Sequence, residues 1–181
     1  AGDQLRVSEE RVMTHARDLA EGIGPRVVST PAMEPAEWYV VDRARELVEE
    51  ISAARADDMD VDLSIHRPTG SFRLNFLNKD IANAYTNLTN VVVRVAPKDA
   101  QSDAKSVLLN AHFDTTLGSP GGADCASCVG MLLEILRVMA RPGTRVPAAP
   151  VLFLFNGGEE TFMQAAHGFV AHHPWATTVG A

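Results

Sequence analysis

The sequence predicts an α/β fold in which helices flank a mostly parallel central sheet. The spacing of apolar residues changes from helical to alternating near residue 60, and the second half of the chain then repeats strand and helix in turn. Two of its strand segments, 89–97 and 106–112, are apolar almost throughout. Strands of that kind are covered on both faces, as in sheets sandwiched by helices.

The first half of the chain begins with two amphipathic helices. One starts after Ser8, has acidic residues in its first turn and ends near Gly24. A second, longer helix is predicted over residues 35–54. Apolar and polar residues then alternate in VDLSIH from Val61 and in FRLNFL from Phe72, which predicts two strands with one solvent-facing side.

The second half alternates strands and helices. Strands are predicted at 89–97 (TNVVVRVAP), 106–112 (SVLLNAH) and 151–155 (VLFLF). Helices are predicted at 125–140 and 160–171.

Composition limits the classes of partner. The formal net charge is -7 and the 16 Lys and Arg are scattered, so nucleic acid is not an expected partner. No apolar run approaches the roughly 18 to 20 residues that cross a bilayer, and the first residues lack the features of a signal peptide. We therefore expect the chain as given to be soluble.

With 181 residues, 46% of them apolar, and no repeat or linker, residues 1–181 are predicted to form a single domain.

Candidate metal ligands follow the predicted strands. In open α/β sheets, ligands gather beyond the carboxyl ends of the strands. His112 ends one strand, and Asp114, two residues later, points to the same face. An imidazole binds a metal through one nitrogen while a carboxylate fixes its other N–H. The pair therefore suits a metal ligand and the group that orients it.

Three further carboxylates extend this set. Asp124 stands at the start of the apolar helix, where it either caps the helix or bridges two cations. Glu159 and Glu160 follow a strand and two glycines, so they can reach one cavity from different sides. Taken singly, each feature also has a purely structural interpretation, such as a helix cap or a response to the helix dipole. Their joint placement favours a metal site in which one Glu binds metal and the other takes a proton from water.

Three motifs in register resemble a known family. AHFDT, GGADCASC and LFNGGEE, in this order and at this spacing, resemble the M28 metallopeptidases, a group of co-catalytic zinc aminopeptidases. TNLTNVVVR, the CxxC-bearing helix and AAHGFVAHHPWA are similar to the endoplasmic reticulum metallopeptidase 1-like branch of that family. The similarity runs from about residue 8 to the end of the chain.

The resemblance implies a fold, a reaction and a role for each candidate residue. The fold is a zinc-exopeptidase-like α/β/α sandwich with a mixed sheet, and the reaction is zinc-dependent hydrolysis of a peptide substrate, often at a free N-terminus. His112 is implied to bind one zinc, Asp124 to bridge two, and Glu160 to bind the second. Glu159 is implied to be the general base, and Asp114 to orient His112. In many members the peptide bond after the bridging Asp is cis, which here is the bond from Asp124 to Cys125.

The sequence departs from the family pattern in two ways. Many members have an Asp-Asp doublet where this chain has only Asp124. The remaining acidic ligand and the last His of the family lie beyond HHPWA, outside this sequence. We therefore expect a C-terminally incomplete catalytic domain that is inactive alone. Its exposed sheet edge is expected to be covered by the rest of the domain or by a partner chain.

The same resemblance implies a cellular location for the protein. The related branch is typically membrane-embedded with a lumenal peptidase domain, so we expect the endoplasmic reticulum membrane, lumenal side, or another secretory or vacuolar compartment. The triplet Asn87-Leu88-Thr89 is a glycosylation acceptor and agrees with this expectation.

Other residues are interpreted as structural. The CxxC of Cys125 and Cys128 is weak evidence for zinc, and we interpret the two cysteines as small helix residues, leaving a disulfide open. Trp38 and Trp175 are expected in the core. Surface or packing roles are expected for His15, His66, His167, His172 and His173.

Two other functions compete with the peptidase. One is an inactive M28-like scaffold or interaction module in a membrane-associated assembly, which predicts no zinc. The other keeps the fold and changes the reaction, as in the glutaminyl cyclases, which use one zinc for acyl transfer. Metal content separates all three.

Overall fold

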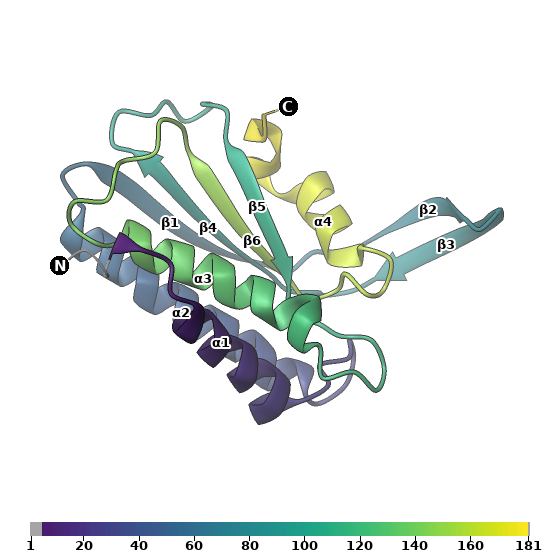
Figure 1. The fold of residues 1–181 in the computed structure, drawn as a ribbon. Coiled ribbons are helices and arrows are strands. Elements are labelled where there is room, and N and C mark those ends of the chain that lie inside the picture. The colour runs from purple at the N-terminus through teal and green to yellow at the C-terminus, as the bar shows by residue number, and fades with distance from the viewer. Residues whose placement is uncertain (1–4, 181) are drawn as a thin grey trace.

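The computed structural model describes residues 5–180 (Figure 1). The strands are β1 (Met59–His66), β2 (Gly70–Phe76), β3 (Lys79–Tyr85), β4 (Asn90–Pro97), β5 (Val107–His112) and β6 (Val151–Asn156). The helices are α1 (Glu9–Arg17), α2 (Met33–Ala54), α3 (Ser127–Met139) and α4 (Gln164–His172), with short helical turns η2 (Asp18–Ile23), η3 (Gly122–Ala126) and η4 (Pro174–Thr178). No described helix is long and apolar enough to span a bilayer.

The strands form one four-stranded sheet and a separate hairpin. The sheet has the order β1-β4-β6-β5, and β2 pairs only with β3. The predicted α/β fold with a mixed sheet between helices is confirmed. The expectation of mostly parallel pairing is wrong for the described sheet, because β1/β4 and β4/β6 are antiparallel and only β5/β6 is parallel. The crossover through α3 makes the β5/β6 pair parallel, whereas the other strands join without a crossover helix.

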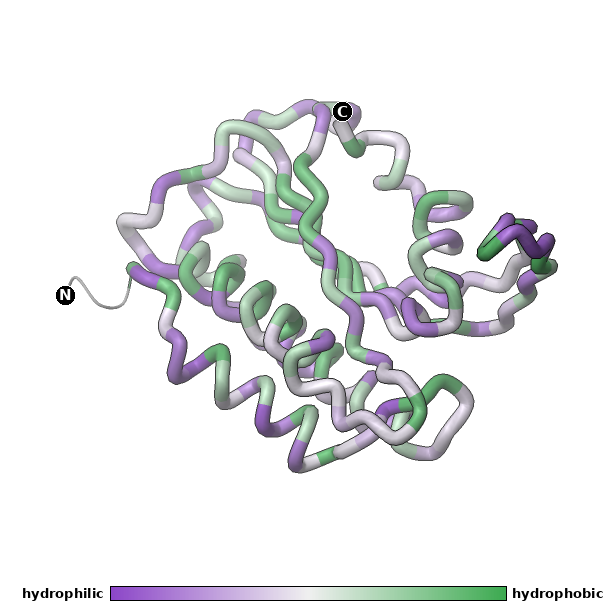
Figure 2. Tube along the Cα trace, turned by 45° about the vertical axis from the view of Figure 1, so that its right-hand side comes forward, coloured by the Kyte–Doolittle hydropathy of each residue, from purple (hydrophilic) through white to green (hydrophobic). Residues whose placement is uncertain are grey.

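Helices cover both faces of the sheet. α1, α2 and α3 pack on one face and α4 lies on the other (Figure 1). Alternate residues of β4 divide between the two sides: Val91 and Val93 join the large core under α1 to α3, while Val92 packs with Phe169 of α4. Hydrophobic residues accordingly gather in the strands at the middle of the molecule (Figure 2). The strands 89–97 and 151–155 are thus buried on both faces, as their composition predicts.

The hairpin of β2 and β3 extends away from the sheet (Figure 1). The sequence indicates β2 but not β3, whose segment KDIANAY is rich in residues that disfavour strands. The two strands join through Leu77 and Asn78, which have φ of 51° and 60°. Positive φ at both central residues is the geometry of tight hairpin turns, and Leu is an unusual residue for it. Asn78 favours such a turn, but the Leu77-Asn78 pair is not one of the typical hairpin-turn pairs, so the sequence signal is weak at this point.

Two element boundaries and one core residue differ from expectation. α4 begins at Gln164 rather than at residue 160, because Phe162 and Met163 have positive φ and interrupt the helix. The helix after Ser8 changes to the η2 turn at Asp18. Trp38 is 47% exposed, so its expected place in the core is wrong: it lies on the outer face of α2, whereas Trp175 packs against the smaller core.

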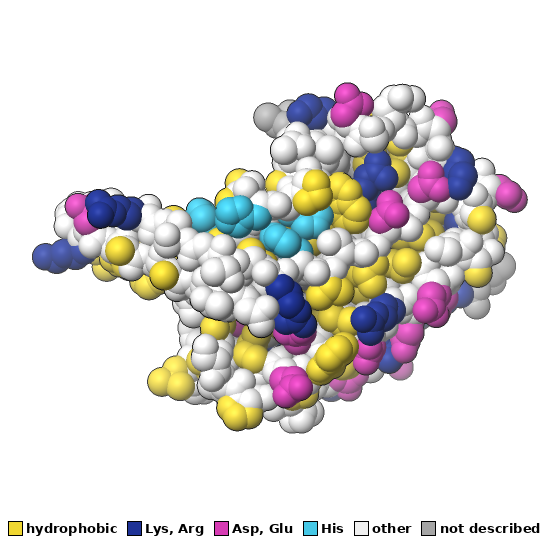
Figure 3. Space-filling model, turned by 180° about the vertical axis from the view of Figure 1, so that it is seen from behind, with side chains coloured by type: hydrophobic (Ala, Val, Ile, Leu, Met, Phe, Trp, Pro, Cys, Tyr) yellow, Lys and Arg dark blue, Asp and Glu magenta, His cyan; other side chains and the backbone are white. Residues whose placement is uncertain are grey.

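The histidines predicted to have packing or surface roles are found there. His167 stacks on Phe72 of the hairpin, and His66 and His173 meet with ring centroids 5.0 Å apart. Histidine side chains gather between the hairpin and the body on the face shown in Figure 3. His15 of α1 forms a hydrogen bond with the Tyr39 hydroxyl of α2, and His172 is exposed.

One edge of the four-stranded sheet is largely unpaired within the described residues. β5 is an edge strand, and just before it Ser106 forms a parallel bridge with Val179. The Ser106 N–H donates to the Thr178 carbonyl at 2.8 Å, and the Gly180 N–H donates to the Ser106 carbonyl at 3.0 Å. The chain thus begins to add a strand at this edge.

A buried arginine joins three loops near the end of β5. Arg26 has no exposed surface, and its guanidinium donates to the carbonyl of Phe113, the residue before Asp114. Burial lowers the pKa of Arg26, and the negative charge of Asp114 opposes that effect. The guanidinium donates only to backbone carbonyls, those of Leu19, Gly24, Phe113, Pro120 and Gly121. No sequence pattern marks Arg26 as a buried residue.

A buried carboxylate fixes α3 against the N-terminal segment. Glu134 is 1% exposed and accepts hydrogen bonds from Arg11, Arg137 and the Ser8 N–H. Burial raises the pKa of Glu134, but the hydrogen bonds from the two arginines and from Ser8 outweigh it and hold the pKa at about 2. The ionised form therefore stabilises this contact.

Arg26→Lys is expected to destabilise the fold by about 2 to 4 kcal/mol. The lysine ammonium has three N–H donors where the guanidinium has five, so buried carbonyls would be left without a donor. Urea unfolding measures the change. Arg43→Lys is the control, since Arg43 pairs with Glu46 at the surface and its replacement is expected to cost less than about 0.5 kcal/mol. Equal effects in the two variants would contradict this account of Arg26.

Glu134 is expected to make stability depend on pH in the acid range. Its folded pKa is lowered, so its contribution is present above about pH 4.5 and is lost as the pH falls towards 2. Glu134→Gln is expected to be less stable at neutral pH and to lose less stability than the wild type over this interval. Urea unfolding at several pH values tests this. Glu46→Gln, at an exposed pair, should retain the wild-type slope.

Candidate metal centre

The parallel pairing of β5 and β6 places two strand ends side by side. His112 of β5 is in register with Asn156 of β6, and two glycines follow Asn156. A Cβ on Gly157 would lie 2.5 Å from the Phe113 ring, and one on Gly158 would lie 2.9 Å from the Leu88 side chain. Glycine is therefore needed here for the β6 end to approach its neighbours closely.

Asp114 connects the two strand ends. Its carboxylate has no exposed surface and accepts the backbone N–H groups of Glu159 and Glu160, each at 3.0 Å. The His112 Nδ1 lies 3.1 Å from the backbone oxygen of Asp114 and 3.4 Å from its Oδ1. This geometry suits the orienting role expected for Asp114. It also gives Asp114 a second contact, with the acidic pair, that the sequence did not indicate.

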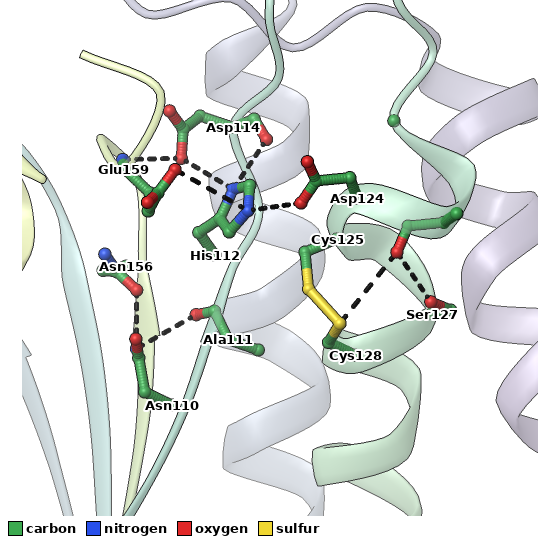
Figure 4. The surroundings of a disulfide bond; sticks show 12 residues. Asn110, Ala111, His112, Asp114, Asp124, Cys125, Ser127, Cys128, Asn156 and Glu159 are labelled. Atoms are coloured by element: carbon green, nitrogen blue, oxygen red, sulfur yellow. Dashed lines mark hydrogen bonds and ion pairs between the residues drawn. A yellow bond between two sulfur atoms is a disulfide. The ribbon is translucent and has the colours of Figure 1, made fainter. Parts of the chain in front are cut away.

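Two carboxylates face the other nitrogen of the imidazole. The Nε2 atom of His112 lies 3.0 Å from Asp124 Oδ1 and 4.0 Å from Glu159 Oε2 (Figure 4). The side chain of His112 is only 9% exposed, whereas that of Asp124 is 78% exposed. The ring is thus held at the base of the site, with carboxylate oxygens towards solvent.

The electrostatics of the site favour positive charge. Burial lowers the pKa of His112, but its contacts with Asp114, Asp124 and Glu159 outweigh that effect and raise the pKa to about 9. Burial and the neighbouring charges of Asp124 and Glu159 raise the pKa of Glu160. A metal ion binds the neutral imidazole, so it would take the place of the proton that these carboxylates stabilise.

Asp124 lies in a turn ahead of α3. The Asp124–Cys125 peptide bond is cis, as the family resemblance implied. Asp124 has φ of -116° and ψ of 93°, and no side chain caps η3 or α3. The alternative in which Asp124 caps the helix is therefore wrong: its carboxylate contacts His112 instead.

The two cysteines form a disulfide between Cys125 and Cys128. The interpretation that they are helix residues without chemistry is therefore wrong. The CxxC spacing at the start of a helix is the sequence feature that could have indicated this disulfide. The structure also brings the Cys125 sulfur close to His112 and Asp124. Within residues 5–180, these three form the group whose possible ligand atoms all lie within 4.8 Å of one another, and Glu159 and Glu160 are not members of it.

The donor set nevertheless fits zinc. An imidazole nitrogen and carboxylate oxygens are ordinary zinc ligands, and here they converge on one side of a buried ring. Glu160 is fixed at its backbone by Asp114 and experiences the charges of Asp124 and His112. The structure thus brings His112, Asp114, Asp124 and Glu159 into contact, with Glu160 beside them.

Relatives in sequence are named as a metallopeptidase of the endoplasmic reticulum and a protease of the vacuolar membrane. The chain is 40% identical over 169 residues to endoplasmic reticulum metallopeptidase 1 of Homo sapiens, a match that covers 92% of this chain and 18% of the human protein. It is 35% identical over 97 residues to the vacuolar membrane protease of Yarrowia lipolytica, covering 54% of this chain and 10% of that protein. The chain thus spans less than a fifth of the length of these relatives.

Solved structures share the fold. BSAP, a zinc aminopeptidase from Bacillus subtilis, matches with a TM-score of 0.65 at 15% identity, over 93% of this chain and 65% of that chain. A glutaminyl cyclase from Macrostomum lignano matches with a TM-score of 0.51 at 17% identity, over 84% of this chain and 38% of the other.

The family model described as Peptidase family M28 matches residues 90–181, which is more than half of the chain and includes every candidate ligand. The motifs, the mixed sheet between helices and the ligand-bearing strand ends agree with that match. The chain belongs to peptidase family M28.

Proposed function

We propose that the chain is the N-terminal portion of a zinc peptidase domain that hydrolyses peptide bonds, with the specificity of an aminopeptidase. The observation that carries the proposal is the convergence of Asp124 and Glu159 on the Nε2 side of His112, while Asp114 holds the opposite side of the ring. Such an arrangement presents one metal-facing nitrogen and a neighbouring base. Membership of a metallopeptidase family supports it.

Each residue has a proposed role. His112, Asp124 and Glu160 hold the metal, and Glu159 is the general base. Glu159 lies 4.0 Å from His112 Nε2, so its carboxylate is close enough to receive a proton from water that attacks the peptide carbonyl. Asp114 fixes the backbone from which both glutamates extend. When bound, zinc supplies Lewis acidity that polarises the carbonyl and acidifies water.

The proposed complete domain holds two zinc ions. Asp124 is the proposed bridge, and its 78% exposed carboxylate supports this, because one oxygen faces His112 while the group remains open to a second cation. Glu160 is the proposed ligand of the second ion. A glutaminyl cyclase-like reaction would use one zinc for acyl transfer, so the metal count separates the two reactions.

We also propose a location in the endoplasmic reticulum membrane system, lumenal side, or alternatively in another secretory or vacuolar compartment. The name of the human relative, which places it in the endoplasmic reticulum, and that of the Yarrowia lipolytica relative, a vacuolar membrane protease, support this location. The Cys125–Cys128 disulfide is a second support, because disulfides persist in oxidising compartments. Asn87 is exposed and remains a glycosylation candidate.

The unpaired edge of β5 is the proposed contact for the rest of the domain or for a partner chain. The bridge between Ser106 and Val179 supports this, because it starts a parallel pairing that the remainder of β5 can continue. A covered edge also avoids the association that exposed strands promote.

Zinc analysis after loading and dialysis is the first test. We expect about two zinc ions per chain, and loss of most of them in Asp124→Ala, because this variant removes the proposed bridging ligand. Asp42→Ala is the control, since Asp42 lies on α2 in an exposed pair with Arg45 and should leave zinc unchanged. Absence of retained zinc in the wild type would favour the scaffold alternative.

Glu159→Gln tests the general base. The test uses the complete protein, in which the family resemblance implies two further metal ligands. There this variant should hydrolyse peptides with a free N-terminus about 10² to 10⁴-fold more slowly, with its zinc content unchanged. Glu160→Gln is the matched comparison and should lose zinc as well as activity. Full activity in Glu159→Gln would refute the assignment.

A further inference from the structure

The disulfide lies beside the proposed metal ligands. Figure 4 shows Cys125 next to Asp124, with its sulfur bonded to Cys128 in the first turn of α3. The Cys125 sulfur, an imidazole nitrogen of His112 and a carboxylate oxygen of Asp124 lie within 4.8 Å of one another. Both cysteines are half-buried. A potential sulfur ligand is therefore present at the site but is bonded to another atom.

We propose that reduction of the Cys125–Cys128 disulfide converts Cys125 into a metal ligand, so that the site binds zinc through His112, Asp124 and Cys125. In the oxidised chain the metal is left to the nitrogen and oxygen ligands alone. The inference rests on the proposed metal site and adds control of its ligand set by redox state.

The chemistry of sulfur explains the difference between the two states. Zinc is bound by thiolates, and a sulfur in a disulfide has no negative charge to offer. Ligand atoms on one tetrahedral zinc are about 3.5 Å apart, given bond lengths near 2.0 to 2.3 Å. Three atoms already within 4.8 Å of one another need to move by only about 1 Å, which a side-chain rotation of a freed Cys125 supplies.

The position of the disulfide also favours its reduction. The bond joins the η3 turn to the first turn of α3, and both cysteines are only half-buried, so a small reductant can reach it. An exogenous dithiol attacks one sulfur, the S–S bond breaks, and a mixed disulfide forms. The second thiol of the reagent then displaces the protein sulfur. The reagent leaves as a disulfide, and Cys125 and Cys128 each gain one electron and one proton.

Reduction has a functional consequence at this site. A thiolate from Cys125 occupies a coordination position that an N/O-liganded ion leaves open for water or substrate. Closed sites with thiolate ligands hold zinc structurally, whereas catalytic sites keep a position open. The reduced chain therefore retains metal more tightly and presents a less open site.

Cobalt(II) titration tests the inference without an activity assay, because cobalt occupies zinc sites and a thiolate bound to it gives a charge-transfer absorption in the near ultraviolet. The wild-type chain is titrated before and after reduction with a phosphine, which takes up water oxygen to become the phosphine oxide. We expect the absorption only after reduction, together with cobalt binding about tenfold or more tighter.

Two variants that both remove the disulfide make the test specific. Cys128→Ser leaves Cys125 free and is expected to show the thiolate absorption without reductant. Cys125→Ser leaves Cys128 free and is expected to bind cobalt without that absorption. Thermal unfolding checks that both variants are folded. If either variant is unfolded, the comparison of the oxidised and reduced wild type decides the question.

The possible outcomes separate this inference from the proposed metal site. Cobalt bound without thiolate absorption in both the reduced wild type and Cys128→Ser overturns the inference and leaves the metal site standing. An equal absorption in Cys125→Ser overturns the choice of Cys125. If no metal binds in any redox state, both the inference and the proposed metal site are wrong.

Discussion

The buried carboxylate of Asp114 is the interaction on which the site depends. A carboxylate with no exposed surface is stable only if hydrogen bonds and nearby charge replace its hydration. Here the N–H groups of Glu159 and Glu160 satisfy its two oxygens, His112 lies 3.4 Å away, and the positive charge of Arg26 acts on it. The same contacts that stabilise Asp114 therefore determine where two acidic side chains begin and which way the imidazole turns. Removing the carboxylate would leave two peptide N–H groups without their acceptor at the point where β5 and β6 end.

The sequence predicted which acidic side chains lie near His112 better than it predicted the direction of the strands, for a physical reason. The prediction that His112 and Glu159 lie together needs only the parallel pair β5 and β6, and a crossover helix between two apolar strands is a strong signal for that pair. The antiparallel partners β1 and β4 supply none of the candidate ligands, so the wrong expectation of mostly parallel pairing did not displace the site. Metal-ligand motifs at strand ends are local in sequence, whereas the direction of a neighbouring strand depends on the course of the whole chain.

Other features were outside the reach of sequence patterns. Arg26 looks like any loop arginine, and its burial follows only from carbonyls contributed by three separate segments. The contact of Asp124 with His112 depends on the non-helical backbone before α3, which a helix-cap interpretation of the sequence cannot anticipate. The strand β3 has few strand-favouring residues and is held by its pairing with β2 rather than by its own propensity. In each case the deciding contacts join residues distant in the chain.

The charge balance of the site connects these observations. Asp114, Asp124, Glu159 and Glu160 lie around His112 with Arg26 behind them, so acidic groups outnumber the cationic side chains. Such a cluster raises the affinity of the imidazole for a proton and equally attracts a divalent cation, which can neutralise several carboxylates at once. The identity of the ligands then decides what a bound cation can do. Because Cys125 is adjacent in sequence to Asp124 and its sulfur lies close to both His112 and Asp124, the number of negative ligands around such a cation depends on whether that sulfur is bonded to Cys128 or free.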